Sequence, residues 1–242
     1  MRNVLDCINA FIPLLSTEYE LVIGRKGVSV TLKILFDKKD CFHLMGLQYL
    51  ADRPELSRDR GRVFDEIADG TITIEKIKSS DFYNKIEQRV HFLPLLEQMI
   101  DSNDTVFKYN KKANMYSMIE ADYLMENNME SRNLFLFLSN DEGDNYFCRS
   151  FFPEEKMDYS KNQASWTLLY KKKIDLSTGA ETVLYNKITF LHKPFGLIIQ
   201  MAIFYPFLGN GCRKKVRTLK IKKVDDKPMV IHTKEKAKMH RM

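Results

Sequence analysis

The spacing of apolar residues changes once along the chain, near Ser102, and this change restricts the possible folds more than any other feature. Before it, apolar residues recur every three or four positions, as in amphipathic helices. After it, short runs rich in aromatic and β-branched residues are separated by turn signals such as 140–144 and 175–179, which indicates antiparallel strands. The sequence therefore predicts an α+β fold, with N-terminal helices and a β-hairpin packed on a twisted antiparallel β-meander.

The expected elements of the first hundred residues are mostly helices. They are a helix over 2–15, a hairpin of 18–23 and 28–36, a helix over 41–50, a short helix within 57–70, a helical stretch from 73, and a long helix over 80–100, capped by Ser80 and kinked at Pro94. The second half is expected to contain six strands with a helical turn over 121–129. The strands are 105–110, 115–120, 133–138, 145–152, 166–175 and 183–191.

The segment 33–50 joins the hairpin to the most apolar of these helices. A polar break at 37–40 ends the second strand, and the expected helix starts at Cys41. His43 lies at the edge of the apolar stripe of this helix, which is an unusual place for an imidazole. Two interpretations are open: a half-buried histidine bonded to a backbone carbonyl, or a proton-transfer group.

The length of 242 residues suits one domain with an appendage. We expect a domain over 1–193, then an apolar segment and a basic extension over 194–242. The apolar run 195–208 is too short to cross a bilayer of about 30 Å and is expected to form a buried strand or helix. An apolar content of 44% and a charged content of 29% are typical of a soluble globular protein.

Positive charge is concentrated at the C-terminal end. Residues 209–242 contain twelve Lys or Arg against three Asp or Glu, whereas the first 208 residues contain 26 basic and 29 acidic side chains. Such a tail favours binding to a polyanion such as RNA, and a solubilising tail is the alternative. The cations expected to contact phosphate are Arg213, Lys214, Lys215 and Arg217.

The four cysteines are far apart, with no CxxC pair and no histidine cluster at metal-ligand spacing. We therefore expect reduced thiols and no metal or other cofactor. The first fifteen residues carry Asp6 and lack a small-residue cleavage site, so they predict an amphipathic helix and not a secretory signal. A cytoplasmic protein without a membrane partner is expected.

Five short boxes, in order, resemble a known nuclease family. They are F-H-L-x-G-L-x-Y-L over 42–50, F-D-x-I over 64–67, G-x-I-T over 70–73, a long helix with Arg89, and R-S-F-F over 149–152 with Gln163 beyond it. Together they resemble the fourth variety of the phage-associated barnase, EndoU, colicin and RelE-like nucleases, over about 19–173. The resemblance implies metal-free RNA cleavage on an RNase-like α+β scaffold. Residues after Pro194 lie outside it.

Metal-free cleavage requires a base for the 2'-hydroxyl proton, a fixed cation for the phosphoryl charge, and an acid for the departing 5'-oxygen. His43 suits proton transfer because an ordinary histidine pKa is about 6.5. Arg89 suits the cation role because a guanidinium bonds two phosphate oxygens at once. The alternative for Arg89 is a surface side chain lying beside Glu87.

Arg149 and Ser150 are neighbours on an expected strand, so alternation allows only one of them to face the site. The resemblance favours Ser150 as a third catalytic residue that bonds a phosphate oxygen or a sugar hydroxyl; a structural serine is the alternative. Arg149 is the less favoured of the two and is expected to bind substrate. Gln163 and Thr167 are expected to present polar groups to a base edge or phosphate.

The resemblance implies a metal-independent endoribonuclease of a phage, a mobile element or its host, with a toxin-like or phage-conflict role. RNA, for example tRNA, would be cleaved by 2'-hydroxyl attack on phosphate, and an antitoxin or another protein would be a partner. The alternative is a non-catalytic module on the same scaffold that binds nucleic acid or protein, as an inhibitor or regulator. Convergence of His43, Arg89 and Ser150 at one cleft would favour catalysis.

Overall fold

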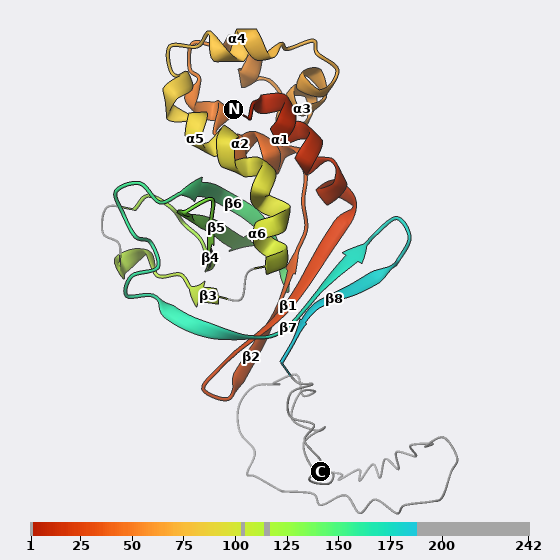
Figure 1. Cartoon of the computed structure of the whole chain (residues 1–242), viewed down its shortest axis with the longest axis vertical. Helices are drawn as coiled ribbons and strands as arrows, with labels where there is room; N and C mark the ends of the chain where they lie inside the picture. The colour runs from red at the N-terminus through yellow and green to blue at the C-terminus, as the bar shows by residue number, and fades with distance from the viewer. Residues whose placement is uncertain (1, 103–104, 114–116, 188–242) are drawn as a thin grey trace, which may run out of the picture. The chain divides into compact units, whose positions relative to one another are not determined.

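The computed structural model describes residues 2–102, 105–113 and 117–187. Its strands are β1 (Thr17–Arg25), β2 (Val28–Ile34), β3 (Thr105–Lys108), β4 (Tyr123–Met129), β5 (Arg132–Asn140), β6 (Asn145–Pro153), β7 (Ala164–Asp175) and β8 (Glu181–Asn186). They form one sheet in the order β1-β2-β6-β5-β4-β3-β7-β8, and β7 also pairs with β1. The first seven strands in this order therefore close into a barrel, and β8 is an additional strand on β7 (Figure 1).

The α+β prediction is confirmed, but the antiparallel meander is not, because the sheet is closed. The β1–β2 hairpin forms as predicted around the turn at 24–27, yet it does not pack on the sheet. It is part of the barrel wall. β2 pairs in parallel with β6 through Lys33 opposite Asn145 and Ile34 opposite Tyr146, and β1 pairs antiparallel with β7.

The helices are grouped at one end of the barrel (Figure 1). They are α1 (Val4–Phe11), α2 (Lys38–Met45), α3 (Arg60–Ala68), α4 (Ile74–Lys78), α5 (Glu87–Phe92) and α6 (Leu96–Ser102). Short 3-10 turns connect several of them, over 13–16, 47–49, 54–57, 83–85 and 93–95. The predicted long helix is interrupted, because Pro94 lies in the turn that separates α5 from α6 and the segment after Ser80 forms a turn.

The helix predicted over 41–50 begins earlier and ends earlier. The polar residues at 37–40 belong to its start: Asp37 caps α2 and accepts a hydrogen bond from the Lys39 N–H at 2.9 Å. Gly46 ends the helix with a left-handed φ of 79°. His43 therefore lies in the last turn of α2 and not near its start.

Two segments of the second half differ from the prediction. Residues 121–129 form no helical turn, because 123–129 is the strand β4 between β3 and β5. Its buried residues Tyr123, Leu124 and Met125 gain two paired neighbours, which outweighs the helical preference of Leu, Met and Glu. The predicted strand over 115–120 also fails, since residues 117–120 contain no strand.

β5 separates two apolar clusters because its side chains alternate. Leu134, Leu136 and Leu138 belong to the main core, which continues from the barrel strands to the helices. Phe135 and Phe137 face a second, smaller cluster on the other side of the wall, where Phe152 and Tyr159 pack against them. The candidate site described below borders this second cluster.

A buried lysine fastens α6 to the barrel. Lys171 on β7 donates from Nζ to the carbonyl oxygens of Ile100 at 2.6 Å and Asp101 at 2.8 Å. The Tyr19 hydroxyl on β1 donates to the Asp101 carboxylate at 2.5 Å. These bonds fix the helical layer, and with it α5, on the barrel.

Several predictions lie outside the described residues. They are the end of the last strand after residue 187, the apolar run 195–208, the domain boundary at residue 193 and the basic extension. Among the helices of the described ranges, none is both long and apolar enough to cross a bilayer.

Candidate active site at the bulge of β6

α2 is held so that His43 lies at the boundary between core and surface. Four of its neighbours on the helix are buried, namely Cys41, Phe42, Leu44 and Met45. The Asp40 carboxylate completes a capping box at the N-terminus of α2 by accepting a hydrogen bond from the Asp37 N–H at 2.9 Å. Burial raises the pKa of this carboxyl group to about 6. His43 itself is half-buried.

The charges of two guanidinium groups act on the His43 imidazole. Burial lowers its pKa from the ordinary value, and the positive charges of Arg60 and Arg149 lower it further. Within the described part of the chain, no hydrogen bond joins its ring to a backbone carbonyl; its ring packs edge-on against Phe42 at 5.8 Å. An imidazole with a lowered pKa is mostly neutral near neutral pH, which is the form that accepts a proton.

α5 places the Arg89 guanidinium against β6, between two aromatic rings. Its Cζ atom lies 4.8 Å from the ring centroid of Phe152 and 5.7 Å from that of Tyr49. Nη1 donates to the Phe151 carbonyl oxygen at 3.2 Å and, more weakly, to Ser150 Oγ at 3.4 Å. These contacts direct Arg89 to β6 and not along the surface.

A bulge in β6 turns both Arg149 and Ser150 away from the main core. Phe137 of β5 lies opposite Ser150 and Leu138 lies opposite Cys148, so Arg149 is an extra residue without a partner on β5. The buried positions of β6 accordingly change from Tyr146 and Cys148 before the bulge to Phe151 and Pro153 after it.

The strict alternation assumed from the sequence is therefore wrong at this point. Arg149 is exposed and acts electrostatically on His43, whereas Ser150 is half-buried and contacts Arg89. The two residues do not exclude each other from the site.

Gly46 allows α2 and α5 to meet at β6. A Cβ atom at this position would lie 2.9 Å from Arg89 Cδ and 3.1 Å from both Ile86 Cγ2 and Tyr49 Cδ2. Gly46 is three residues after His43, and both helices pack against β6. The glycine thus brings the backbone of the His43 helix against the stem of Arg89.

The loop after β6 adds Tyr159 and Glu155, which the sequence analysis did not single out. The Tyr159 ring packs edge-on against Phe152 at 5.4 Å and against Phe137 at 5.3 Å. Burial raises the pKa of the Tyr159 phenol, the Arg89 charge opposes this effect, and the Glu155 charge reinforces it. The only sequence feature that could have pointed to these two residues is their position three and seven residues after the R-S-F-F box.

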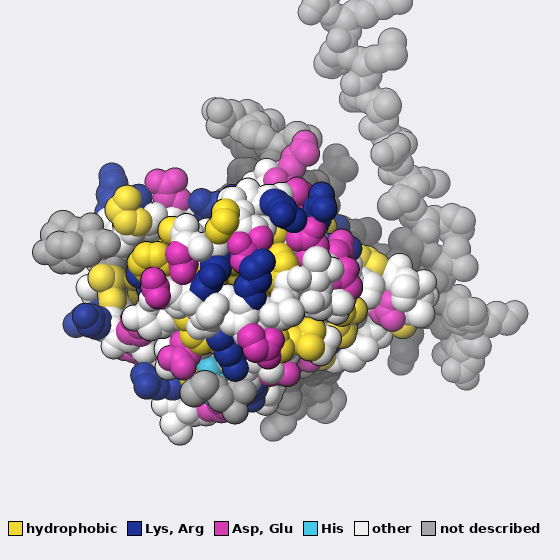
Figure 2. Space-filling view, turned by 90° about the horizontal axis from the view of Figure 1, so that it is seen from above, with side chains coloured by type: hydrophobic (Ala, Val, Ile, Leu, Met, Phe, Trp, Pro, Cys, Tyr) yellow, Lys and Arg dark blue, Asp and Glu magenta, His cyan; other side chains and the backbone are white. Residues whose placement is uncertain are grey.

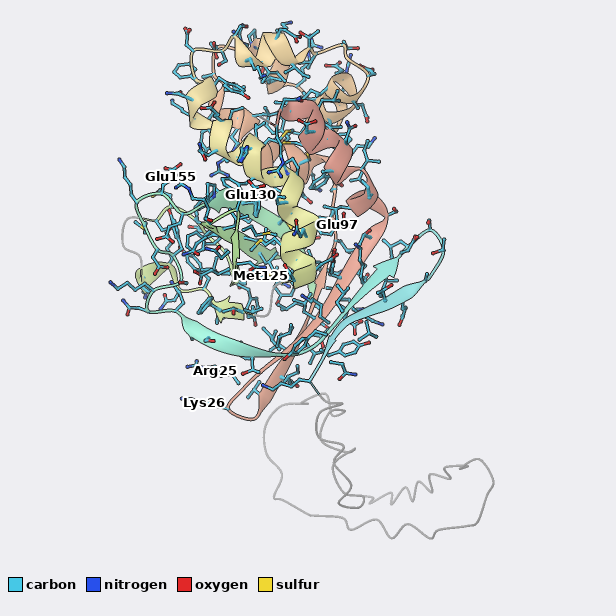
Figure 3. All side chains as sticks on the ribbon, viewed as in Figure 1. Arg25, Lys26, Glu97, Met125, Glu130 and Glu155 are labelled. Carbon is cyan, nitrogen blue, oxygen red and sulfur yellow. The ribbon has the colours of Figure 1, made fainter. Side chains whose placement is uncertain are left out.

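The site lies at the helical end of the barrel. In Figure 3, Glu155 lies beside the helices, whereas Arg25 and Lys26 lie in the β1–β2 turn at the opposite end. Around the helices, the face in Figure 2 shows basic and acidic side chains interspersed. In the ranges that the structure describes, no group of three or more His, Cys, Asp or Glu is arranged to hold a metal ion.

Among the described residues, no hydrogen bond or ion pair joins Gln163 or Thr167 to His43, Arg89, Arg149 or Ser150. The Gln163 amide is paired with the backbone of Asn110, accepting its N–H at 2.7 Å and donating to its carbonyl at 3.2 Å. Thr167 is exposed on β7, opposite Gly24 and Thr105. Their contact with substrate stays a prediction, as does that of the four tail cations at 213–217, which lie outside the described residues.

Comparison with known protein families gave a match over most of the chain. The model of the family described as phage-Barnase-EndoU-ColicinE5/D-RelE like nuclease4 matches residues 3–187. No curated protein and no solved structure matches the chain. The matched segment includes His43, Arg89, Arg149 and Ser150.

Proposed function

Because the chain belongs to the phage-Barnase-EndoU-ColicinE5/D-RelE like nuclease4 family, we propose that it is an endoribonuclease that works without a metal ion. Its substrate would be RNA, for example a folded RNA such as tRNA. Its role would be toxin-like or in conflict between a phage or mobile element and its host, with an antitoxin or another protein as a partner. The observation that carries this proposal is the contact of Arg89 with Ser150 beside the β6 bulge, from which the Arg149 charge also lowers the pKa of His43.

His43 would act as the general base. Its neutral imidazole takes the proton of the 2'-hydroxyl, the 2'-oxygen attacks the adjacent phosphorus, and the bond from phosphorus to the 5'-oxygen breaks. The products are a 2',3'-cyclic phosphate end and a 5'-hydroxyl end. The two guanidinium groups that lower the His43 pKa support this role, because they disfavour the protonated form.

Arg89 would hold the phosphate and stabilise the negative charge that develops on its oxygens. Its guanidinium is anchored by the Phe151 carbonyl and lies between the Phe152 and Tyr49 rings, so little reorganisation is needed when substrate binds. Ser150 would donate its hydroxyl hydrogen to a phosphate oxygen. Arg149, exposed in the bulge, would add a second cation for the same anion.

The departing 5'-oxygen needs a proton from a second group. Tyr159 is a candidate for this donor, because a phenol is protonated near neutral pH and the positive charge of Arg89 favours loss of its proton, against the opposing effect of burial. A non-catalytic binding module would require no such set of proton acceptor, cations and proton donor on neighbouring elements. The contacts between α5 and β6 therefore favour catalysis over the alternative.

The test compares His43→Ala with His91→Ala on total RNA in the presence of EDTA. His91 is a matched control, because it lies on α5 and pairs with Glu130 at 3.2 Å. Loss of a general base should slow cleavage by about 10²-fold or more in His43→Ala, while His91→Ala and the wild-type protein remain active. Equal activity of the two variants would remove His43 from the mechanism, and loss of wild-type activity in EDTA would remove the metal-free mechanism.

A further inference from the structure

Tyr49 presents a large aromatic ring to solvent and has no role in the proposed cleavage mechanism. The residue is 45% exposed. The Arg89 guanidinium lies over its ring, with Cζ 5.7 Å from the centroid. Phe152, the other ring at this guanidinium, is half-buried beneath Tyr159. Tyr49 is therefore the exposed one of the two rings that contact Arg89.

The backbone holds the Tyr49 ring in place. The residue ends the 3-10 turn that follows Gly46, and its N–H donates to the Gly46 carbonyl at 2.9 Å. Leu47 and Leu50 on either side of it are 1% and 2% exposed, so both anchor the turn in the core. The ring edge contacts Gly46, where a Cβ would lie 3.1 Å from Tyr49 Cδ2. An exposed ring with a fixed backbone loses little conformational entropy when a ligand stacks on it.

We propose that Tyr49 is a stacking platform for a nucleobase adjoining the phosphate that Arg89 holds. The inference rests on the proposed endoribonuclease function and adds a base-binding subsite to it. Each base of an RNA strand is joined through its sugar to neighbouring phosphates. A ring whose centroid is 5.7 Å from the phosphate-binding guanidinium is therefore within reach of an adjoining base. Stacking on an aromatic ring accepts every base, because all have a π-face.

This subsite would distinguish unpaired from base-paired nucleotides and would not distinguish one base from another. A base in a duplex is already stacked between its neighbours, whereas an unpaired base can turn out onto a protein ring. Cleavage should therefore occur at unpaired nucleotides, such as those in the loops of a folded RNA. Arg89 lies over the Tyr49 ring, and the proposal places the base on the part of the ring that remains exposed to solvent.

The experiment uses the full-length protein and a short single-stranded RNA whose cleaved bond has first been mapped with wild type. The same RNA is then made with the base removed, in turn, at each of the nucleotides flanking that bond. Tyr49→Ala, Tyr49→Phe and Leu176→Ala are compared. Leu176→Ala is the control, because Leu176 is 51% exposed in the turn between β7 and β8. Circular dichroism and thermal unfolding establish that the variants are folded.

With intact RNA, Tyr49→Ala should lower kcat/KM by about tenfold or more, which corresponds to the loss of one stacked base. Tyr49→Phe keeps the ring and should retain most of the activity, and Leu176→Ala should match wild type. At one flanking position, removing the base should slow wild type to the rate of Tyr49→Ala and should slow Tyr49→Ala no further.

Three results would overturn the inference. The first is activity of Tyr49→Ala equal to that of wild type, and the second is a loss in Tyr49→Phe as large as that in Tyr49→Ala. The third is a loss in Tyr49→Ala that persists at every position from which a base is removed, which would indicate a structural role. In all three cases wild type still cleaves RNA, and the proposed function stands. If wild type cleaves no RNA, the proposed function fails and the base subsite fails with it.

Discussion

His43 differs from an exposed histidine because its surroundings disfavour the positive charge. Burial removes water that would solvate the imidazolium, and Arg60 and Arg149 repel it. Each effect lowers the pKa, so the neutral base predominates to lower pH than in a free histidine. The same arginines would attract the phosphate, and thus a single arrangement serves both the base and the anion.

This electrostatic arrangement predicts the pH dependence of cleavage. The rate should rise with pH through the His43 pKa, and this rise should lie below the range of an ordinary histidine. Removing a nearby positive charge favours the imidazolium and raises the pKa. Arg60→Ala should therefore move the rise in kcat/KM to higher pH, whereas Arg25→Ala, at the opposite end of the barrel in Figure 3, should not. Superimposable pH profiles of wild type and Arg60→Ala would contradict the assignment of the base.

α2, α5 and β6 form the site together, and Gly46, at the end of α2, packs against the Arg89 and Ile86 side chains. The glycine has two tasks here. It adopts a positive φ of 79° to end α2, and it leaves space for the Arg89 stem. A side chain would disturb both, but by different physical effects.

Gly46→Ala and Gly70→Ala separate these effects. Both glycines have positive φ, of 79° and 82°, so alanine should cost each variant about 1–2 kcal/mol of unfolding free energy from backbone strain. A Cβ at Gly70 meets nothing within 4 Å, whereas one at Gly46 lies 2.9 Å from Arg89 Cδ. Urea unfolding should therefore show destabilisation of both variants, larger in Gly46→Ala because its Cβ also lies 3.1 Å from Cγ2 of the buried Ile86. RNA cleavage should fall by more than about tenfold only in Gly46→Ala. A parallel loss of activity in both variants would mean that the position of Arg89 is not sensitive to this contact.

The molecule as a whole combines a barrel of mixed surface charge with a strongly basic C-terminal sequence. In Figure 2, acidic and basic side chains are interspersed around the helices, which offers no broad cationic surface on that face. Residues 209–242 carry twelve Lys or Arg and three Asp or Glu. Because the first 208 residues carry 26 basic and 29 acidic side chains, long-range attraction of RNA is expected to depend mainly on residues 209–242.

Salt dependence measures that contribution. If six tail cations contact phosphates of a single strand, the logarithm of affinity should fall with the logarithm of salt concentration with a slope of about −4 to −5. Truncation after Leu208 should weaken binding more than about tenfold at low salt and flatten the slope. Changing Arg213, Lys214, Lys215 and Arg217 to Gln keeps the length and should reduce the slope by about 3.

The control for this prediction is the folding of the truncated protein. Apolar residues alternate with polar ones in part of the tail, so circular dichroism must match that of the full-length protein before affinities are compared. Equal slopes for the full-length, truncated and Gln-substituted proteins would assign the tail to something other than phosphate, such as a protein partner.

The amino-acid sequence by itself determined the local features. Helical spacing before Ser102, alternation after it, and turn residues such as those at 24–27 depend on neighbours in the chain, and they predicted the α+β class and most strand positions. The family boxes led to His43, Arg89 and Ser150, and the structure places Arg89 in contact with Ser150. These three residues remain candidates whose roles the proposed experiments test.

The tertiary structure decided which distant segments pair and where alternation breaks. The β1–β7 and β2–β6 pairings that close the barrel join residues more than a hundred positions apart, and hydrophobic periodicity identifies a buried face without identifying its partner. β4 is a strand because two neighbouring strands pair with it, against its local preference. The bulge at Arg149 arises from the pairing of β6 with β5, and a single extra residue reverses which side chains face the core. Arg149 and Ser150 both reach the site for that reason, since the facing of a side chain depends on strand pairing and packing, which no local pattern contains.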